Sequence, residues 1–250
     1  MKIIEFGQQN SKVIILLHGG GLGWWNYQRV AQLLCPKYHV ILPILDGHAG
    51  SDCNFVSIKQ NAQEVIEFID KNHNGKVHLI GGLSLGAQIA ITMLALRPDI
   101  CQHALIESAA VIPDPLIHNL LPVTLTSSYQ LIQQKWFAHW QFQALKIPPA
   151  FFENYYHDTC QLSQANLTAI LVANTSFTVP LNLAHSQAQI LIVVGARENH
   201  RMIRSALLLH KIHPHSYLQI ESGLFHGQYS LSHPEKVVAD IKRLFTNSVR

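Results

Sequence analysis

The sequence has little charge and no cluster of positive residues, and both features exclude partners. Asp, Glu, Lys and Arg make up only 13% of its 250 residues, against about 25% in typical domains. That scarcity favours a well-buried sheet. The net charge is +3 with neutral histidines, and the basic residues are scattered. Because nucleic-acid binding needs a positive stripe or patch, we expect no nucleic-acid partner.

The sequence also lacks a cysteine framework and long apolar runs. Its four cysteines are far apart, with no C-x-x-C pair: Cys35, Cys53, Cys101 and Cys160. This spacing predicts free thiols in a reducing compartment and no zinc site. No run approaches the roughly 18 apolar residues of a membrane span, and the first residues do not predict a secretory signal. We therefore expect a cytoplasmic protein.

Six apolar runs predict strands, at residues 13–17, 39–42, 77–80, 103–106, 190–194 and 217–220. They are mostly unbroken and β-branched, which is typical of a parallel sheet buried on both faces. Helical patterns alternate with them, with capping signals at Ser57-x-x-Gln60 and Ser232-x-x-Glu235. The alternation predicts an α/β fold with a doubly wound, mostly parallel sheet.

Residues 113–180 interrupt this alternation. They contain no convincing strand, but several helix-like pieces rich in aromatic residues, among them Trp136, Trp140 and Tyr155. We interpret them as a helical cap inserted between late strands, with residues 1–112 and 181–250 forming the core domain. Most of these aromatic side chains are expected to form the cap's own core, and the rest to line an acyl pocket.

The most informative motif is Gly82-x-Ser84-x-Gly86. It follows the apolar run 77–80 and precedes the helix-like run 87–96, the setting of a nucleophile elbow. A serine on a sharp strand-to-helix turn has strained dihedral angles, and its neighbours two residues away must be nearly free of side chain. The motif predicts Ser84 as a nucleophile, with the Leu85 amide at the start of a helix.

A serine nucleophile needs a histidine base and an acid that orients the base. Glu198 follows the predicted strand 190–194, and His226 lies in a glycine-flanked loop after the strand 217–220. The order Ser84, Glu198, His226 is the nucleophile–acid–histidine order of one hydrolase fold. Rival acids remain open, namely Glu107, Asp114 and Glu221.

The run His18-Gly19-Gly20-Gly21 follows the first predicted strand. Glycines there allow backbone N–H groups to turn into a cleft without steric cost. We expect the amides of Gly20 and Leu85 to bind an oxyanion, with Gly21 as second choice. Gly21 and Trp24 are candidate substrate-binding residues, and His18 is expected to brace the loop.

These motifs together resemble the α/β-hydrolase superfamily, in particular small, single-cap serine hydrolases of the carboxylesterase and lipase-like kind. The resemblance is carried by residues 17–20, 82–86, 195–198 and 223–227. It covers essentially the whole chain, with residues 113–180 matching only as a cap of variable sequence. It implies the α/β-hydrolase fold and a second oxyanion amide at Gly20. The chain departs from the family in the turn 43–51, where Ile44 and Asp46 replace the usual Asp and Pro, and at Glu198, where Asp is usual.

The predicted activity is hydrolysis of carboxylic esters with short to medium apolar acyl groups, with a small-molecule ester as partner and no cofactor. The alternatives are a thioesterase or C–C bond hydrolase with the same triad, or a non-catalytic, receptor-like binding protein. The chain has 16 histidines, but none has the partners and spacing of a metal site. The sequence leaves the oligomeric state open.

Overall fold

Seven strands form one sheet in the computed structural model, which describes residues 1–246 apart from the side chains of residues 122, 123, 126 and 127. The strands are β1 (Lys2–Phe6), β2 (Val13–Leu17), β3 (His39–Ile44), β4 (Val77–Leu83), β5 (Cys101–Glu107), β6 (Gln189–Gly195) and β7 (Tyr217–Glu221). Their order is β1-β3-β2-β4-β5-β6-β7. Only the β1–β3 pair is antiparallel, so the predicted mostly parallel sheet is confirmed.

The six predicted strands are all present, and β1 is an addition to them. Every residue of β2 and β3 is buried, which explains their unbroken apolar sequences. By contrast, β1 is an edge strand with no fully buried residue, so its sequence carries a weaker apolar signal. β4 and β5 extend three residues and one residue beyond the predicted ends, to Leu83 and Glu107.

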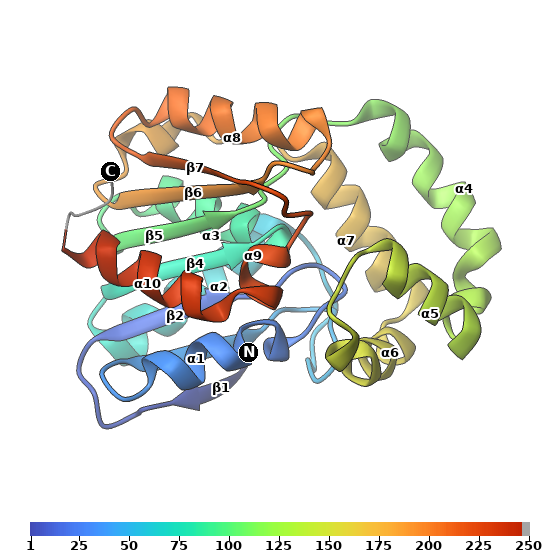
Figure 1. Ribbon diagram of the computed structural model, residues 1–250, viewed down its shortest axis with the longest axis horizontal. Coiled ribbons are helices and arrows are strands. Elements are labelled where there is room, and N and C mark those ends of the chain that lie inside the picture. The colour runs from blue at the N-terminus through green and yellow to red at the C-terminus, as the bar shows by residue number, and fades with distance from the viewer. Residues whose placement is uncertain (247–250) are drawn as a thin grey trace.

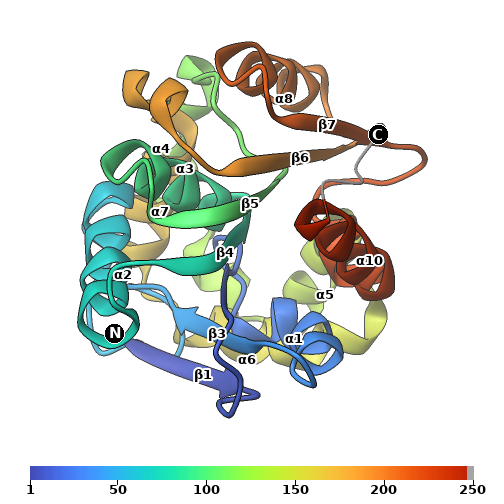
Figure 2. The same ribbon diagram turned by 90° about the vertical axis from the view of Figure 1, so that its left-hand side faces the viewer.

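Helices cover both faces of the sheet. The α-helices of the described residues are α1 (Gln28–Leu34), α2 (Ile58–His73), α3 (Leu85–Leu96), α4 (Pro115–Ile132), α5 (Lys135–Ala144), α6 (Phe152–Gln161), α7 (Gln164–Ser176), α8 (His200–Ile212), α9 (Gln228–Ser232) and α10 (Pro234–Phe245). Figure 2 shows α1 and α10 on one face and α2 and α3 on the other, and each pair packs into a separate apolar cluster with the sheet between them. Within residues 1–246, no helix has the length and apolar character needed to cross a membrane.

The two predicted capping signals have different outcomes. Ser57 caps α2, because its Oγ accepts a hydrogen bond from the Gln60 N–H at 3.0 Å. The prediction for Ser232 is wrong: it is the last residue of α9, and α10 begins at Pro234 after His233. The short helix α9 therefore separates the His226 loop from the amphipathic helix α10.

The helical insertion, residues 113–180, contains α4 to α7 between β5 and β6 and no strand among its described residues. Figure 1 shows these helices beside the sheet, past the strand ends. Phe142 and Tyr155 are buried within it, as expected of core aromatics. Trp136 and Trp140 instead expose 67% and 63% of their surface, so the expectation that the aromatic residues form the insertion's core is wrong for these two.

Candidate active site

Ser84 lies at the turn between β4 and α3. Its φ of 53° and ψ of −109° put a residue with a side chain in a strained region of backbone space. The Ser84 N–H donates to the Glu107 carbonyl at 2.9 Å, and the Gln88 N–H donates to the Ser84 carbonyl at 3.0 Å. The turn is therefore held from the neighbouring strand on one side and by the first turn of α3 on the other.

The glycines of the motif are explained by close backbone approach. A Cβ on Gly82 would overlap the backbone of Gly86, and a Cβ on Gly86 would overlap the carbonyl of Leu17. Since backbone atoms cannot move aside as a flexible side chain can, both positions require glycine. The spacing of the motif thus follows from the close approach of the first turn of α3 to the ends of β4 and β2.

Glu198 and His226 form a hydrogen-bonded pair. The His226 Nδ1 lies 2.8 Å from the Glu198 Oε2, and the Glu198 side chain is only 1% exposed. Its other oxygen, Oε1, accepts from the Ser108 hydroxyl at 2.7 Å and the Gly195 N–H at 2.8 Å. Burial raises the pKa of Glu198, but the hydrogen bond and charge of His226, with these two donors, outweigh burial and lower the pKa.

Ser108 is a site residue that the sequence reasoning missed. It directly follows β5, has a φ of 51°, and donates its N–H to the Val193 carbonyl of β6. This geometry turns its hydroxyl toward Glu198. The available signal was a small polar residue just beyond a strand's carboxyl end, but its partner is 90 residues away in sequence.

The three rival acids have other partners. Glu107 accepts from the Ser230 N–H at 3.1 Å and from the Tyr27 hydroxyl at 3.5 Å. Asp114 caps α4 and pairs with Arg201 at 3.1 Å. Glu221 pairs with Lys236 at 3.1 Å. Among the described carboxylates, only Glu198 is hydrogen-bonded to His226.

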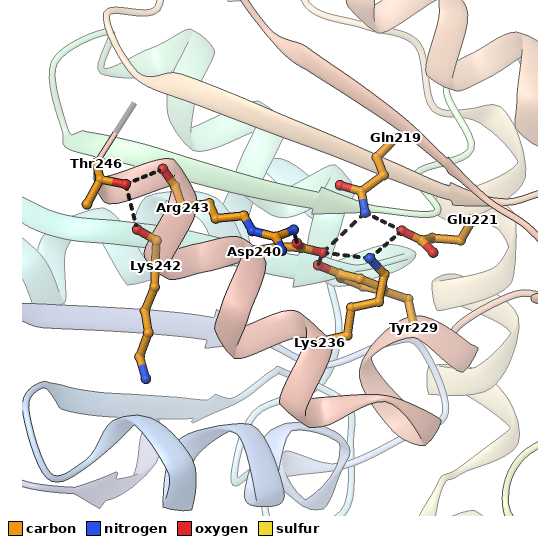
Figure 3. Close-up of polar contacts among 8 residues, drawn as sticks. All are labelled: Gln219, Glu221, Tyr229, Lys236, Asp240, Lys242, Arg243 and Thr246. Carbon is orange, nitrogen blue, oxygen red and sulfur yellow. Dashed lines mark hydrogen bonds and ion pairs between the residues drawn. The ribbon is translucent and has the colours of Figure 1, made fainter. Parts of the chain in front are cut away.

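Figure 3 shows a cluster of polar contacts around Asp240 that involves residues on either side of the His226 loop. The buried Asp240 carboxylate contacts the Tyr229 hydroxyl at 3.0 Å and the Gln219 amide at 3.2 Å, joining α9 and β7 to α10. Lys236 bridges Asp240 and Glu221 at 3.2 and 3.1 Å. Because Gln219 precedes the His226 loop and Tyr229 follows it, one cluster holds both ends of the loop.

The loop after β2 presents backbone amides beside Ser84. A Cβ on Gly20 would lie 3.5 Å from the Leu85 Cβ, so the two residues are neighbours. Among the described residues, neither the Gly20 N–H nor the Leu85 N–H has a hydrogen-bond partner. By contrast, the Gly21 N–H donates to His48 Nε2 at 3.1 Å, so of the three candidate oxyanion amides only those of Gly20 and Leu85 are unpaired among the described residues.

Two buried histidines brace this loop. The His18 Nε2 accepts from the Leu45 N–H at 3.2 Å, and its Nδ1 contacts the Gly19 carbonyl at 2.9 Å. Burial, with a smaller effect of His48, lowers the pKa of His18 to about 3, and burial lowers the pKa of His48 to about 4. Both rings are therefore neutral near pH 7 and serve as hydrogen-bonding supports.

The candidate site residues lie around one cavity of about 400 Å³. It is lined by Gly20, Ser84, Glu198 and His226, together with apolar residues from the core and the insertion. No hydrogen bond joins the Ser84 hydroxyl to His226 within residues 1–246, and such contacts often tighten only when a substrate is bound. Gly21 and Trp24 do not line this cavity; Trp24 packs against the apolar cluster of α1 and α10.

The described residues of the insertion contribute no aromatic side chain to the cavity. The insertion's lining residues are Ala144, Leu145, Lys146, Ile147 and Asn174, so the expectation that aromatic residues of the insertion line an acyl pocket is wrong. Asn174 of α7 also exchanges hydrogen bonds of 3.0 Å with Gln88 of α3. The insertion is thereby joined to the helix that follows Ser84.

No cluster of three or more His, Cys, Asp or Glu side chains suited to a metal ion occurs in the described part of the chain. The four cysteines are free thiols.

Comparison with known sequences finds a matching family profile and a partial match to a known protein. A family profile described as "Alpha/beta hydrolase family" matches residues 14–241. A probable alcohol acetyltransferase of Cyberlindnera fabianii is 30% identical over 108 residues, which cover 42% of this chain and 29% of that protein. The match therefore spans less than a third of the relative's length.

Solved structures resemble the whole chain. An esterase of Thermogutta terrifontis aligns with a TM-score of 0.80 and 15% identity, covering 100% of this chain and 94% of the esterase. A carboxylesterase structure from Nitrososphaera gargenis aligns with a TM-score of 0.77 and 18% identity, covering 99% and 94% of the two chains. At these identities the likeness establishes the fold alone.

Proposed function

Since this chain belongs to the alpha/beta hydrolase family, we propose that it is a serine hydrolase of carboxylic esters with Ser84, His226 and Glu198 as its triad. One observation carries the proposal: a strained serine, a glutamate-bound histidine and a glycine loop with a free amide line a single cavity. The esterases among the structural neighbours agree with this choice of reaction.

In the proposed mechanism, Glu198 holds the Nδ1–H of His226, so that Nε2 accepts the proton of Ser84. The serine oxygen attacks the ester carbonyl carbon, and the Gly20 and Leu85 amides bind the resulting oxyanion. Loss of one such donor typically costs about 2.7–4 kcal/mol of transition-state stabilisation.

His226 then returns the proton to the leaving alcohol, and the carbonyl re-forms as an acyl-enzyme. A water molecule deprotonated by His226 attacks this intermediate, and the collapse releases the carboxylic acid and restores Ser84. Every proton step uses His226, so no cofactor enters the cycle.

The cavity supports the expected acyl preference. Leu22, Leu83, Leu145, Ile147 and Met202 line it, and a volume of about 400 Å³ suits a short to medium apolar acyl group. A cytoplasmic location is part of the proposal, supported by the free thiols, which a reducing compartment preserves.

The test is hydrolysis of p-nitrophenyl esters of increasing acyl length by the protein and its Ser84→Ala variant. We expect turnover to fall by about 10⁴-fold or more in the variant, and to be unchanged in Ser11→Ala, whose serine is exposed and outside the cavity. Equal turnover by Ser84→Ala would contradict the proposal. Turnover of thioesters or C–C substrates alone would favour the other carbonyl chemistries, and binding without turnover would favour a receptor-like protein.

A further inference from the structure

Two cations line the cavity without a carboxylate partner. Lys146 and Arg197 are both exposed at its wall, and neither forms an ion pair with any described residue. The one carboxylate that lines the cavity among the described residues, Glu198, is buried and already paired with His226. The cavity therefore presents two uncompensated positive charges to whatever enters it.

Both residues contact the segment that carries His226, Arg197 through its guanidinium and backbone N–H and Lys146 through its backbone carbonyl. The Arg197 guanidinium lies 5.5 Å from the centre of the Phe225 ring, and the Arg197 N–H donates to the Leu224 carbonyl at 2.9 Å. This cation–π contact holds the guanidinium beside the loop.

Lys146 reaches the same segment from the insertion. Its carbonyl accepts a hydrogen bond from the Gln228 side chain at 3.0 Å, and Gln228 in turn accepts from the Phe225 N–H at 2.9 Å. Lys146 also has a φ of 58°, a left-handed conformation that is unusual for a residue with a side chain. The Lys146 side chain therefore extends from a backbone that lies next to the His226 loop.

The two charges have a clear chemical consequence. Arg and Lys side chains bind carboxylates and phosphates, and an arginine does so through paired hydrogen bonds. In a cavity with apolar walls, uncompensated charges of one sign also raise the local concentration of oppositely charged ligands. A neutral apolar ester would leave both cations unused.

We propose that the substrate carries an anionic group, held by Arg197 and Lys146, at some distance from the bond cleaved at Ser84. This inference rests on the proposed hydrolase function and revises its substrate class from a wholly apolar ester to one that carries an anion. The anion is either a carboxylate at the far end of the acyl chain or a phosphate on the leaving group.

Two matched pairs of substrates distinguish these sources. The acyl pair is p-nitrophenyl hexanoate and p-nitrophenyl hydrogen adipate, which share a six-carbon acyl chain and differ in the terminal carboxylate, placed too far from the ester for rapid intramolecular attack. The leaving-group pair is butyryl-4′-phosphopantetheine and butyryl-pantetheine, which share the thioester and the pantetheine arm and differ in one phosphate. We expect kcat/KM to be at least about tenfold higher for the charged member of one pair.

The preference should depend on the two cations. Arg197→Gln and Lys146→Gln should each raise KM for the charged substrate about fivefold to tenfold more than they raise KM for its neutral partner, with little change in kcat. Arg204→Gln is the matched control, because it removes the same charge from an exposed position on α8 outside the cavity. No preference in either pair, or an equal loss in the control, would overturn the proposal.

A binding measurement separates this proposal from the hydrolase proposal. The Ser84→Ala variant is titrated with adipamate against hexanamide, and with 4′-phosphopantetheine against pantetheine, none of which requires turnover. Tighter binding of one anion, lost in Ser84→Ala/Arg197→Gln, would support the anion site even if esters were not hydrolysed. Equal binding within both pairs would reject it even if Ser84 hydrolysed esters.

Discussion

A buried glutamate lies at or just beyond the carboxyl end of each of two neighbouring strands, Glu107 at β5 and Glu198 after β6. The two carboxyl groups differ in ionisation. Glu198 receives hydrogen bonds from His226, Ser108 and Gly195, and its pKa is lowered. Glu107 receives only uncharged donors, from Tyr27 and Ser230, and burial raises its pKa to about 8.

This difference shows that burial alone does not decide the charge of an acid. Both side chains are almost fully buried, with Glu198 at 1% exposure and Glu107 at 0%. What separates them is a partner that can be charged, since an imidazolium stabilises a carboxylate and a hydroxyl stabilises it much less. Glu198 is thus suited to orient a base, and Glu107 to serve as a neutral hydrogen-bonding group.

The sharpest test of this comparison is Glu198→Gln. The amide keeps the size of the side chain but removes the charge, and it favours the wrong tautomer of His226. We expect kcat/KM for the best p-nitrophenyl ester to fall by about 10⁴-fold, as for a comparable substitution in a serine protease. A loss below tenfold would mean that Glu198 is not the acid of the triad.

A smaller effect is expected from Ser108→Ala, which removes one hydrogen bond to Glu198 and keeps the Cβ that its φ of 51° already accommodates. Hydrogen bonds to charged groups contribute about 1.5–3 kcal/mol, so kcat/KM should fall roughly tenfold or more. The NMR titration profile of the Glu198 carboxyl should move upward in pH, because the pKa of Glu198 loses a donor that lowers it. An unchanged profile would show that Ser108 does not act through Glu198.

The smallest effect is expected from Glu107→Gln. A neutral amide replaces a carboxyl group that is mostly protonated near pH 7, so kcat/KM should stay within about threefold of the parent protein. If this substitution abolished turnover while Glu198→Gln did not, the roles of the two acids would be reversed.

Glu107 also predicts a pH dependence of stability. The folded-state pKa of about 8 exceeds the usual value of 4.5, so the folded protein binds more protons than the unfolded chain between these values. The free energy of unfolding should therefore fall as pH rises from 5 to 8, by up to about 1.4 kcal/mol per pH unit from this group. Denaturant unfolding of Glu107→Gln at pH 5, 6.5 and 8 should show a flatter dependence.

The sequence predicted most of the sheet because buried parallel strands have continuous apolar runs. It did not predict β1, since an edge strand with partly exposed residues needs no such run. It also missed α9, whose five residues are too few for a helical period. The Ser232 capping signal had the right residues, but the chain uses them to end one helix.

The candidate site was predictable where its chemistry is local in sequence. Gly82, Ser84 and Gly86 act within one turn, so their spacing identifies them. Ser108 and His48 could not be found this way, because their hydrogen bonds reach residues 90 and 27 positions away. Such contacts depend on how strands are ordered in the sheet.

The exchange of hydrogen bonds between Gln88 and Asn174 has a consequence for how this protein could be re-engineered. Gln88 is buried in the first turn after Ser84, and both of its side-chain atoms bind α7 of the insertion. A helical insertion taken from another protein would leave the Gln88 Oε1 without its Asn174 donor, while Nε2 would keep its bond to the Ala110 carbonyl. An unpaired buried acceptor costs about 1–3 kcal/mol. A successful chimera must therefore carry over Asn174 or change Gln88 with it, which makes this pair the natural junction for exchanging substrate specificity.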